Sequence, residues 1–428
     1  MFAWTCCAGS GEYRLEEATR GNAGSKAGTL GLLRRAGFPV PDGFVVPWDS
    51  RSDGAAVDAT TREAVRRELA RLGDPVVAVR SSAAGEDGAP ASAAGQYESI
   101  LGARGLEAVC RALTACRASA GAPRVATYQA RTGASSTSGQ SGTSGQSGTT
   151  GQSARASIAV LVQPMIDAEV SGVMFTPHRR GEPTRIEASW GLGSSLVGGL
   201  VTPDSYGVSG RHVDHSIGSK ATRTDLARST IAPDSDLAQD SGDQAEDSSG
   251  LTTSTVVTEQ QRARALNDDT ILALADLGQR VARFLGAPQD IEWALAGGVL
   301  WLLQARPITA EVPARPRPAP PSGQMLTGTP GSRGTVTAAA RIVRGPSDFA
   351  TVRAGDIIIC PHTSPAWTPL FALAAGVVTE TGGALSHAAI VAREYRIPAV
   401  LGVPAATTRL TTGSRIQLDG AAGTVTVR

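Results

Sequence analysis

The stretch Thr381-Gly-Gly-Ala-Leu-Ser-His-Ala-Ala-Ile-Val-Ala-Arg-Glu394 places one histidine, His387, between a glycine turn and a run of helix-forming residues. Upstream, the apolar residues 374–379 are typical of a short strand, and the two glycines permit the tight turn that must follow it. Residues 388–395 have the composition of a helix, and Pro398 is placed to end the segment. The pattern therefore predicts a strand, a glycine turn and a helix, with His387 at the start of the helix.

A histidine at the start of a helix lies where free backbone N–H groups and the helix dipole favour an anion. An imidazole held there could receive a phosphoryl group and have its negative charge partly compensated. Glycine turns before helices are common, however, and many histidines at helix starts only cap the helix or fill space. The local pattern leaves both interpretations of His387 open.

The composition bounds the class of protein. The chain has 428 residues, of which 41% are hydrophobic, so it can form two or three domains with sizeable cores. Its 40 basic and 39 acidic residues are intermixed, which argues against nucleic acid or an anionic membrane as a partner. No membrane-spanning apolar run and no secretory signal is recognisable in the sequence. The five cysteines have neither the spacing of metal ligands nor the density of a disulfide scaffold. We therefore expect a cytoplasmic protein.

Three biased segments indicate the domain organisation. Residues 134–156 contain Ser-Gly-Gln repeats, which cannot bury enough surface to offset the entropy of ordering and therefore predict a flexible loop. The polar residues 216–259 predict a surface excursion, and the proline-rich residues 311–325 predict an extended linker. We thus predict an α/β (α+β) protein with a large domain over residues 1–310 and a small one over residues 326–428.

Two basic residues of the large domain are candidate phosphate ligands. Lys26 lies in the small-residue run Gly24-Ser-Lys-Ala-Gly28 ahead of an expected helix, where it could meet phosphate as a point charge, although the residues alone favour a solvated loop lysine. The apolar run Val77-Ala-Val-Arg80 predicts a strand that delivers Arg80, whose planar guanidinium suits phosphate oxygens. An ion pair between this arginine and the acidic residues 86–87 is the alternative.

Gln163 and Met165 are candidate purine contacts. They lie at the end of the apolar residues 158–163, which predict a buried strand, as do residues 170–175. A strand end of this kind could offer hydrogen bonds and a soft side chain to a purine, but core packing would explain Met165 equally well.

A predicted hairpin carries a candidate magnesium site. Residues 268–285 have helical apolar spacing, and two strand-like runs follow, joined by Ala296-Gly-Gly298. If these runs pair, Glu292 and Gln304 lie on neighbouring strands and offer the oxygen ligands that Mg²⁺ prefers. Arg306 should point to the same face as Gln304. A buried glutamate that pairs with an arginine for purely structural reasons is the alternative.

Longer stretches of the sequence resemble one known family. The run from Val377 to Gly402 closely resembles the swivelling phosphohistidine domain of the phosphoenolpyruvate-utilising enzymes, which include phosphoenolpyruvate synthase, pyruvate phosphate dikinase and the rifampin phosphotransferases. The segment Pro361-His-Thr-Ser-Pro-Ala-Trp-Thr-Pro-Leu370 is similar to the one that precedes the histidine loop of that family. The motifs of the large domain resemble the family's ATP-grasp nucleotide-binding domain and occur in the same order.

This resemblance implies that the large domain binds ATP with Mg²⁺ on Glu292 and Gln304, and that ATP gives its β-phosphoryl group to His387 and leaves as AMP. The expected ATP ligands are Lys26, Arg80, Gln163, Met165, Glu292, Gln304 and Arg306.

The resemblance does not identify the phosphoryl acceptor, because neither the barrel nor the antibiotic-binding domain of those relatives is recognisable in this sequence. Three alternatives stay open. The chain could phosphorylate a small molecule, such as pyruvate or a hydroxyl compound that includes antibiotics. It could be a half-dikinase whose acceptor domain is a separate protein, or a nucleotide-binding protein without catalysis.

Overall fold

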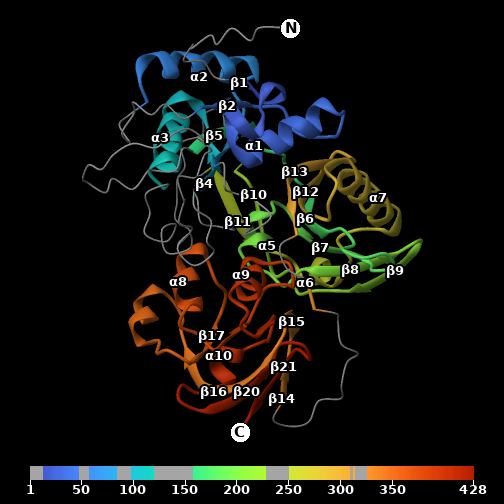
Figure 1. The fold of residues 1–428 in the computed structure, drawn as a ribbon, viewed down its shortest axis with the longest axis vertical. Coiled ribbons are helices and arrows are strands. Elements are labelled where there is room, and N and C mark those ends of the chain that lie inside the picture. Colours follow the sequence, from blue (N-terminus) through green and yellow to red (C-terminus); the bar gives the residue numbers. More distant parts are fainter. Residues whose placement is uncertain are drawn as a thin grey trace, which may run out of the picture.

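A computed structural model describes residues 13–47, 57–83, 98–119, 158–227, 250–308, 312–313 and 325–428. The chain forms two domains, of which the C-terminal one lies at the bottom of Figure 1 in orange and red. Within the described ranges the strands form four sheets, three of them in the N-terminal domain. The predicted α/β class is confirmed.

The first sheet has α1 on one face and α2 and α3 on the other. The strand order is β1-β2-β5-β3-β4, and each neighbouring pair is antiparallel. Leu30 and Leu33 of α1 pack against Leu161, whereas Leu69 and Leu113 pack against the opposite face. The elements are β1 (Tyr13–Arg14), η1 (Leu15–Glu17), α1 (Arg20–Arg35), β2 (Phe44–Val46), α2 (Ala59–Arg71), β3 (Val77–Ala83), β4 (Ser99–Ala103), α3 (Gly105–Ala118) and β5 (Ile158–Pro164).

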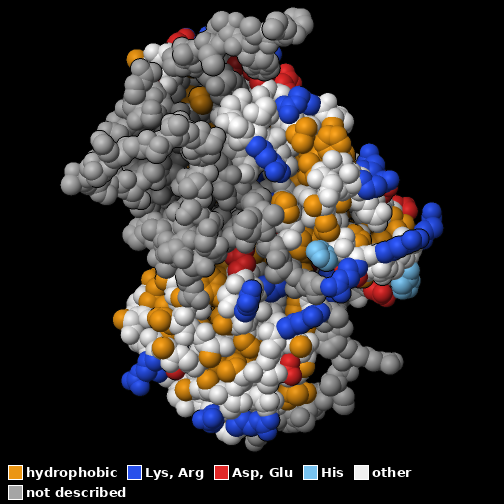
Figure 2. Space-filling model, viewed as in Figure 1, with side chains coloured by type: hydrophobic (Ala, Val, Ile, Leu, Met, Phe, Trp, Pro, Cys, Tyr) orange, Lys and Arg blue, Asp and Glu red, His pale blue; other side chains and the backbone are white. Residues whose placement is uncertain are grey.

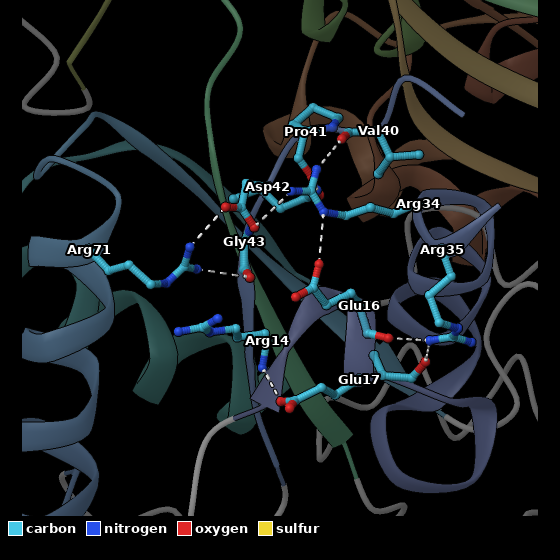
Figure 3. Close-up of polar contacts among 12 residues, drawn as sticks. Arg14, Glu16, Glu17, Arg34, Arg35, Val40, Pro41, Asp42, Gly43 and Arg71 are labelled. Atoms are coloured by element: carbon cyan, nitrogen blue, oxygen red, sulfur yellow. Dashed lines mark hydrogen bonds and ion pairs between the residues drawn. The ribbon is translucent and has the colours of Figure 1, made fainter. Parts of the chain in front are cut away.

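The start of α1 is fixed by a close backbone approach. Gly24 breaks the helical geometry with a φ of 75°, and a Cβ atom there would lie 2.0 Å from the carbonyl oxygen of Ser82 on β3. Only glycine combines that backbone conformation with so little space. At the other end of α1, Arg34 and Arg71 approach Asp42 from opposite sides, which holds the segment that leads into β2 (Figure 3).

The second sheet has the order β13-β12-β6-β7-β8-β9, and one of its faces packs on α7. The predicted helix over residues 268–285 is confirmed; Asn267 caps its start and Gly286, with a φ of 76°, ends it. The predicted hairpin at Ala296-Gly-Gly298 is also confirmed. The elements are β6 (Val170–Phe175), β7 (Thr184–Trp190), α5 (Ser194–Val197), β8 (Asp204–Ser209), β9 (His212–Ser216), α7 (Asp268–Leu285), β12 (Gln289–Ala296) and β13 (Val299–Pro307).

The polar residues 216–259 contain more regular structure than the sequence predicted. Strands β10 (Thr222–Leu226) and β11 (Leu251–Thr255) pair antiparallel, and α6 (Thr258–Arg262) follows. Threonine-rich strands favour the β conformation, which the overall polarity concealed. Lys220 and Asp204, both fully buried, form an ion pair that ties this ribbon to β8. Residues 134–156, residues 228–249 and most of the linker over residues 311–325 lie outside the described residues.

The C-terminal domain is built on one mixed sheet with the order β14-β21-β20-β16-β17-β18-β19-β15, in which β16 to β19 pair in parallel. The predicted strand, turn and helix are confirmed as β18 and α9, and α9 begins at His387 itself. The elements are β14 (Met325–Thr327), β15 (Thr329–Ser332), β16 (Thr335–Ile342), η3 (Pro346–Thr351), β17 (Ile357–Cys360), η4 (Pro365–Trp367), α8 (Thr368–Phe371), β18 (Gly376–Thr379), α9 (His387–Tyr395), β19 (Ala399–Leu401), α10 (Ala406–Arg409), β20 (Arg415–Asp419) and β21 (Thr424–Val427).

The two domains meet at the glycine turn that precedes α9. The Gly382 N–H donates to the carbonyl oxygen of Val201 at 3.1 Å, and the Thr381 hydroxyl donates to the carbonyl oxygen of Gly199 at 2.6 Å. On the face drawn in Figure 2, acidic and basic side chains lie close to the level where the domains meet. In the described parts of the chain, no helix is long and apolar enough to cross a membrane.

Candidate active site

Strands β12 and β13 present four polar side chains to the face of the second sheet that is turned away from α7. Glu292 is the register partner of Gln304, and Asp290 is the partner of Arg306. Arg306 Nε donates to Asp290 Oδ2 at 2.9 Å, and both side chains are less than a tenth exposed. The structure therefore confirms the predicted juxtaposition of Glu292, Gln304 and Arg306 and adds a buried carboxylate, Asp290.

Arg80 on β3 reaches both candidate magnesium ligands. Its Nη2 donates to Gln304 Oε1 at 2.6 Å and to Glu292 Oε2 at 3.3 Å, while Nη1 donates to the Leu303 carbonyl oxygen at 2.7 Å. Two oxygen atoms thus converge on one cationic group, and oxygen is the donor type that a hard cation prefers. The alternative partners of Arg80, at residues 86–87, lie outside the described residues.

No group of three or more His, Cys, Asp or Glu side chains that could hold a metal occurs in the described ranges. A magnesium ion bound by Glu292 and Gln304 would therefore need further oxygen ligands from nucleotide phosphates and water. This is the usual manner of binding for Mg²⁺, so the residues present fit the ion.

The predicted turn ahead of the helix is present at Gly24, where non-helical backbone geometry separates two helical pieces of α1. Lys26 lies two residues after this break, so it belongs to the second helical piece and not to a loop. Lys26 is buried, and its Nζ donates to the carbonyl oxygen of Ser81 at 3.1 Å. This bond places the ammonium group beside the residue that follows Arg80.

Gln163 and Met165 make contacts within the protein. Gln163 is buried, and its Nε2 donates to the Pro41 carbonyl oxygen at 3.0 Å. The sulfur of Met165 accepts the Gly102 N–H at 3.1 Å. Their roles as purine contacts stay predictions, because these bonds serve the packing of β5 against its neighbours.

His387 is the first residue of α9, and its imidazole is buried. Nδ1 lies 3.4 Å from the Thr363 hydroxyl, whereas Nε2 has no hydrogen-bond partner among the residues that the structure describes. Burial, together with the positive charge of Arg306, lowers the pKa of His387 to about 4. The ring is therefore neutral at pH 7, which is the protonation state that a nucleophilic imidazole needs.

Glu187 on β7 is a site residue that the sequence reasoning missed. Through Val173 it is in register with Glu292, so its side chain lies on the same face of the sheet. Its Oε2 accepts the Leu385 N–H at 3.2 Å, and burial raises the pKa of its carboxyl group to about 7. A Cβ atom on Gly383 would lie 2.3 Å from that oxygen, so glycine is needed there for the approach. The sequence feature that could have indicated this residue is a single carboxylate within a buried strand.

Arg393 is a second missed residue, and it holds the histidine loop within its own domain. Its Nη1 donates to the carbonyl oxygens of Ala384 and Gly331, both at 2.8 Å. The side chain lies nearly two turns along α9 and is buried, so these hydrogen bonds tie the loop to the helix. The sequence feature that could have indicated this role is an arginine near the end of a helix made mostly of small and apolar residues.

Charged side chains on β12 and β13 thus lie close to a buried, neutral histidine on a second domain. Comparison with protein families agrees: residues 54–323 match the pyruvate phosphate dikinase AMP/ATP-binding domain, and residues 352–423 match the mobile domain of PEP-utilising enzymes. The chain belongs to the family of phosphoenolpyruvate-utilising enzymes, with an ATP-binding domain followed by a mobile phosphohistidine domain.

Individual relatives point the same way. The chain is 32% identical to a probable phosphoenolpyruvate synthase of Methanothermobacter thermautotrophicus, over 95% of this chain and 61% of the relative. A probable phosphoenolpyruvate synthase of Archaeoglobus fulgidus is 32% identical, and a phosphoenolpyruvate synthase of Aeropyrum pernix is 31% identical; each match covers 94% of this chain and 56% of the relative. The chain thus spans little more than half the length of these relatives.

Proposed function

We propose that this chain is an ATP-dependent phosphotransferase of the dikinase type, in which ATP phosphorylates His387 and leaves as AMP. One observation carries the proposal: a buried, neutral imidazole whose Nε2 has no partner in the described residues lies close to Arg306 of the nucleotide-binding domain. Burial of an imidazole nitrogen without a partner is costly, and a functional nucleophile is one reason to retain it.

In the proposed step, the Nε2 lone pair forms a bond to the β-phosphorus of ATP. The bond from that phosphorus to the oxygen bridging the α-phosphate breaks, and the oxygen leaves with AMP. Water takes the γ-phosphoryl group as inorganic phosphate, so the β-phosphoryl group remains on His387. The step needs in-line alignment and compensation of charge on the phosphates.

The chain's own residues supply these requirements. Lys26, Arg80 and Arg306 would hold the phosphate oxygens, because their cationic groups surround the end of β3 and the hairpin. The free N–H groups at the start of α9 would receive the phosphoryl group. Mg²⁺, held by Glu292 and Gln304, would neutralise phosphate charge when bound.

The acceptor of the second step is also proposed. Pyruvate is the first candidate, since the relatives are named phosphoenolpyruvate synthases. Other small hydroxyl compounds, including antibiotics, come next. The alternative is a half-dikinase subunit whose acceptor domain is a separate protein; a nucleotide-binding protein without catalysis is the weakest candidate, because the paired site residues are all present. No nucleic acid or membrane partner is proposed, and we expect the protein to act in the cytoplasm.

Isotope labelling tests the first step. Full-length protein incubated with Mg²⁺ and β-³²P-ATP should acquire label that is stable in base and lost in acid, and γ-³²P-ATP should release its label as inorganic phosphate. His387→Ala should abolish the labelling. The matched control is His215→Ala, on the exposed strand β9, which should label normally. Label that persists in His387→Ala contradicts the mechanism.

A further inference from the structure

Leu385, two residues before His387, contacts the other domain. The side chain is 2% exposed, and its apolar neighbours Val173, Phe175, Leu196 and Val201 all belong to the nucleotide-binding domain. These neighbours come from β6, α5 and the segment after α5, and each is itself buried. A residue of the histidine loop thus fills an apolar pocket of the domain that is proposed to hold ATP.

The backbone around Leu385 is held from the same side. Its N–H donates to Glu187 at 3.2 Å, while the Gly382 N–H and the Thr381 hydroxyl donate to carbonyl oxygens of the nucleotide-binding domain. Arg185 and Arg393 are the cations that face Glu187, from β7 itself and from α9. The apolar contact and the hydrogen bonds therefore fix the same loop, on the N-terminal side of His387.

We propose that Leu385 is a positioning residue that anchors the histidine loop in the pocket formed by Val173, Phe175, Leu196 and Val201, so that His387 is presented to the nucleotide. This inference rests on the proposed function. In the described residues, the apolar cluster around Leu385 includes neither His387 nor any of the candidate ATP ligands. Its removal should therefore slow phosphorylation of His387 without weakening ATP binding.

The first test measures the docking of the two domains and does not depend on phosphoryl transfer. Small-angle scattering of the full chain without nucleotide, and hydrogen exchange of the segment 381–386, report whether the domains stay together. Leu385→Asp places a charge in the apolar pocket and should expand the particle and speed exchange; Leu385→Ala should do so to a smaller extent. Leu373→Asp is the matched control, because Leu373 is on the same domain and 46% exposed. A Leu385→Asp protein that is folded, as compact as the wild type and equally protected overturns the proposal.

The second test measures phosphorylation directly. At saturating β-³²P-ATP in a single turnover, Leu385→Ala should lower the rate constant for labelling by about 10- to 100-fold, since docking loses most of a buried leucine contact. The dissociation constant for ATP should stay within about twofold of the wild type, because the contact is made only in the docked position. A loss that appears in ATP affinity instead overturns the proposal.

A double-mutant cycle shows whether the contact crosses the interface. Leu196→Ala removes part of the pocket from the other domain, so the double variant Leu196→Ala, Leu385→Ala should lose less than the product of the two single losses. Independent, multiplicative losses would mean that Leu385 acts only within its own domain. If the wild type acquires no label at all, the proposed function fails, and scattering and exchange still decide on the anchor. If the wild type is labelled and the Leu385 variants match it in every assay, the anchor fails alone.

Discussion

The polar groups on strands β12 and β13 and those of the histidine loop differ in whether they have hydrogen-bond partners. On the strands, Arg80 contacts Glu292 and Gln304, and Arg306 contacts Asp290, so the cations and the oxygen ligands pair with one another. In the histidine loop, Nε2 of His387 is buried without a partner in the described residues. The difference shows which side must rearrange to accept a ligand: the strands exchange existing contacts for new ones, whereas the imidazole only gains one.

Self-pairing of this kind has a consequence for stability. Hydrogen bonds to charged groups each contribute about 1.5–3 kcal/mol net, and leaving a buried charge unpaired costs more. The strands thus hold their charges in place without nucleotide, and the nucleotide must supply contacts at least as good. Three experiments test this difference between the strands and the histidine loop, in order of decreasing expected effect.

Glu292→Ala should have the largest effect, because it removes a candidate metal ligand and one partner of Arg80. AMP formation should fall by about 10²–10³-fold, as expected when a group that stabilises transferring phosphate is lost. The fold should persist, since the Glu292 side chain is 26% exposed. AMP release and the thermal unfolding midpoint check both points. Asp276→Ala, an exposed carboxylate on α7, is the control, and unchanged AMP formation in Glu292→Ala refutes the metal role.

The effect of acid pH on AMP formation should come chiefly from His387. The pKa of buried His387 is lowered from 6.5 to about 4, so the neutral ring is favoured in the docked loop, and that preference is lost as the pH falls through about 4. AMP formation should hold from neutral pH to about pH 5 and then fall, by about tenfold per pH unit below pH 4. Reactions are quenched in alkali, and circular dichroism at each pH separates titration from unfolding. A loss centred near pH 6.5 would show that the ring is solvated.

Thr363→Val should have the smallest effect. Its hydroxyl lies 3.4 Å from Nδ1 of His387, a weak contact that helps to orient the ring. Loss of one neutral hydrogen bond predicts a decrease of about two- to tenfold in the labelling rate constant. ATP affinity should not change, and Thr363→Ser should restore the rate. A Thr363→Val protein that labels at the wild-type rate would leave the loop backbone alone to orient the imidazole.

Much of this arrangement was predictable from the sequence. The strand, turn and helix around His387 and the hairpin that pairs Glu292 with Gln304 follow from glycine placement and apolar periodicity, which are local properties. The turn at Gly24 was predicted correctly, but the glycines and small residues did not reveal that the chain is helical on both sides of it and that Lys26 is part of a helix packed against β3. Propensity is a weak guide where tertiary contacts decide.

The contacts between domains could not be predicted in this way. Glu187 and Leu385 lie 198 positions apart, and nothing in either local sequence states that the carboxylate accepts the N–H of the leucine. The apolar pocket around Leu385 is likewise assembled from β6, α5 and the following segment. Such contacts arise only when two separately folded units are brought together.

Glu187 and His387 titrate in opposite directions at this interface. The docked position raises the pKa of Glu187 from 4.5 to about 7 and lowers that of His387 from 6.5 to about 4. When the loop moves into water, both groups return towards their ordinary values, so closure gives the carboxylate a proton and takes one from the imidazole. Between about pH 4.5 and 6.5 the two changes nearly cancel. In the proposed reaction, movement of the mobile domain would then exchange almost no net proton with the solvent in this pH range.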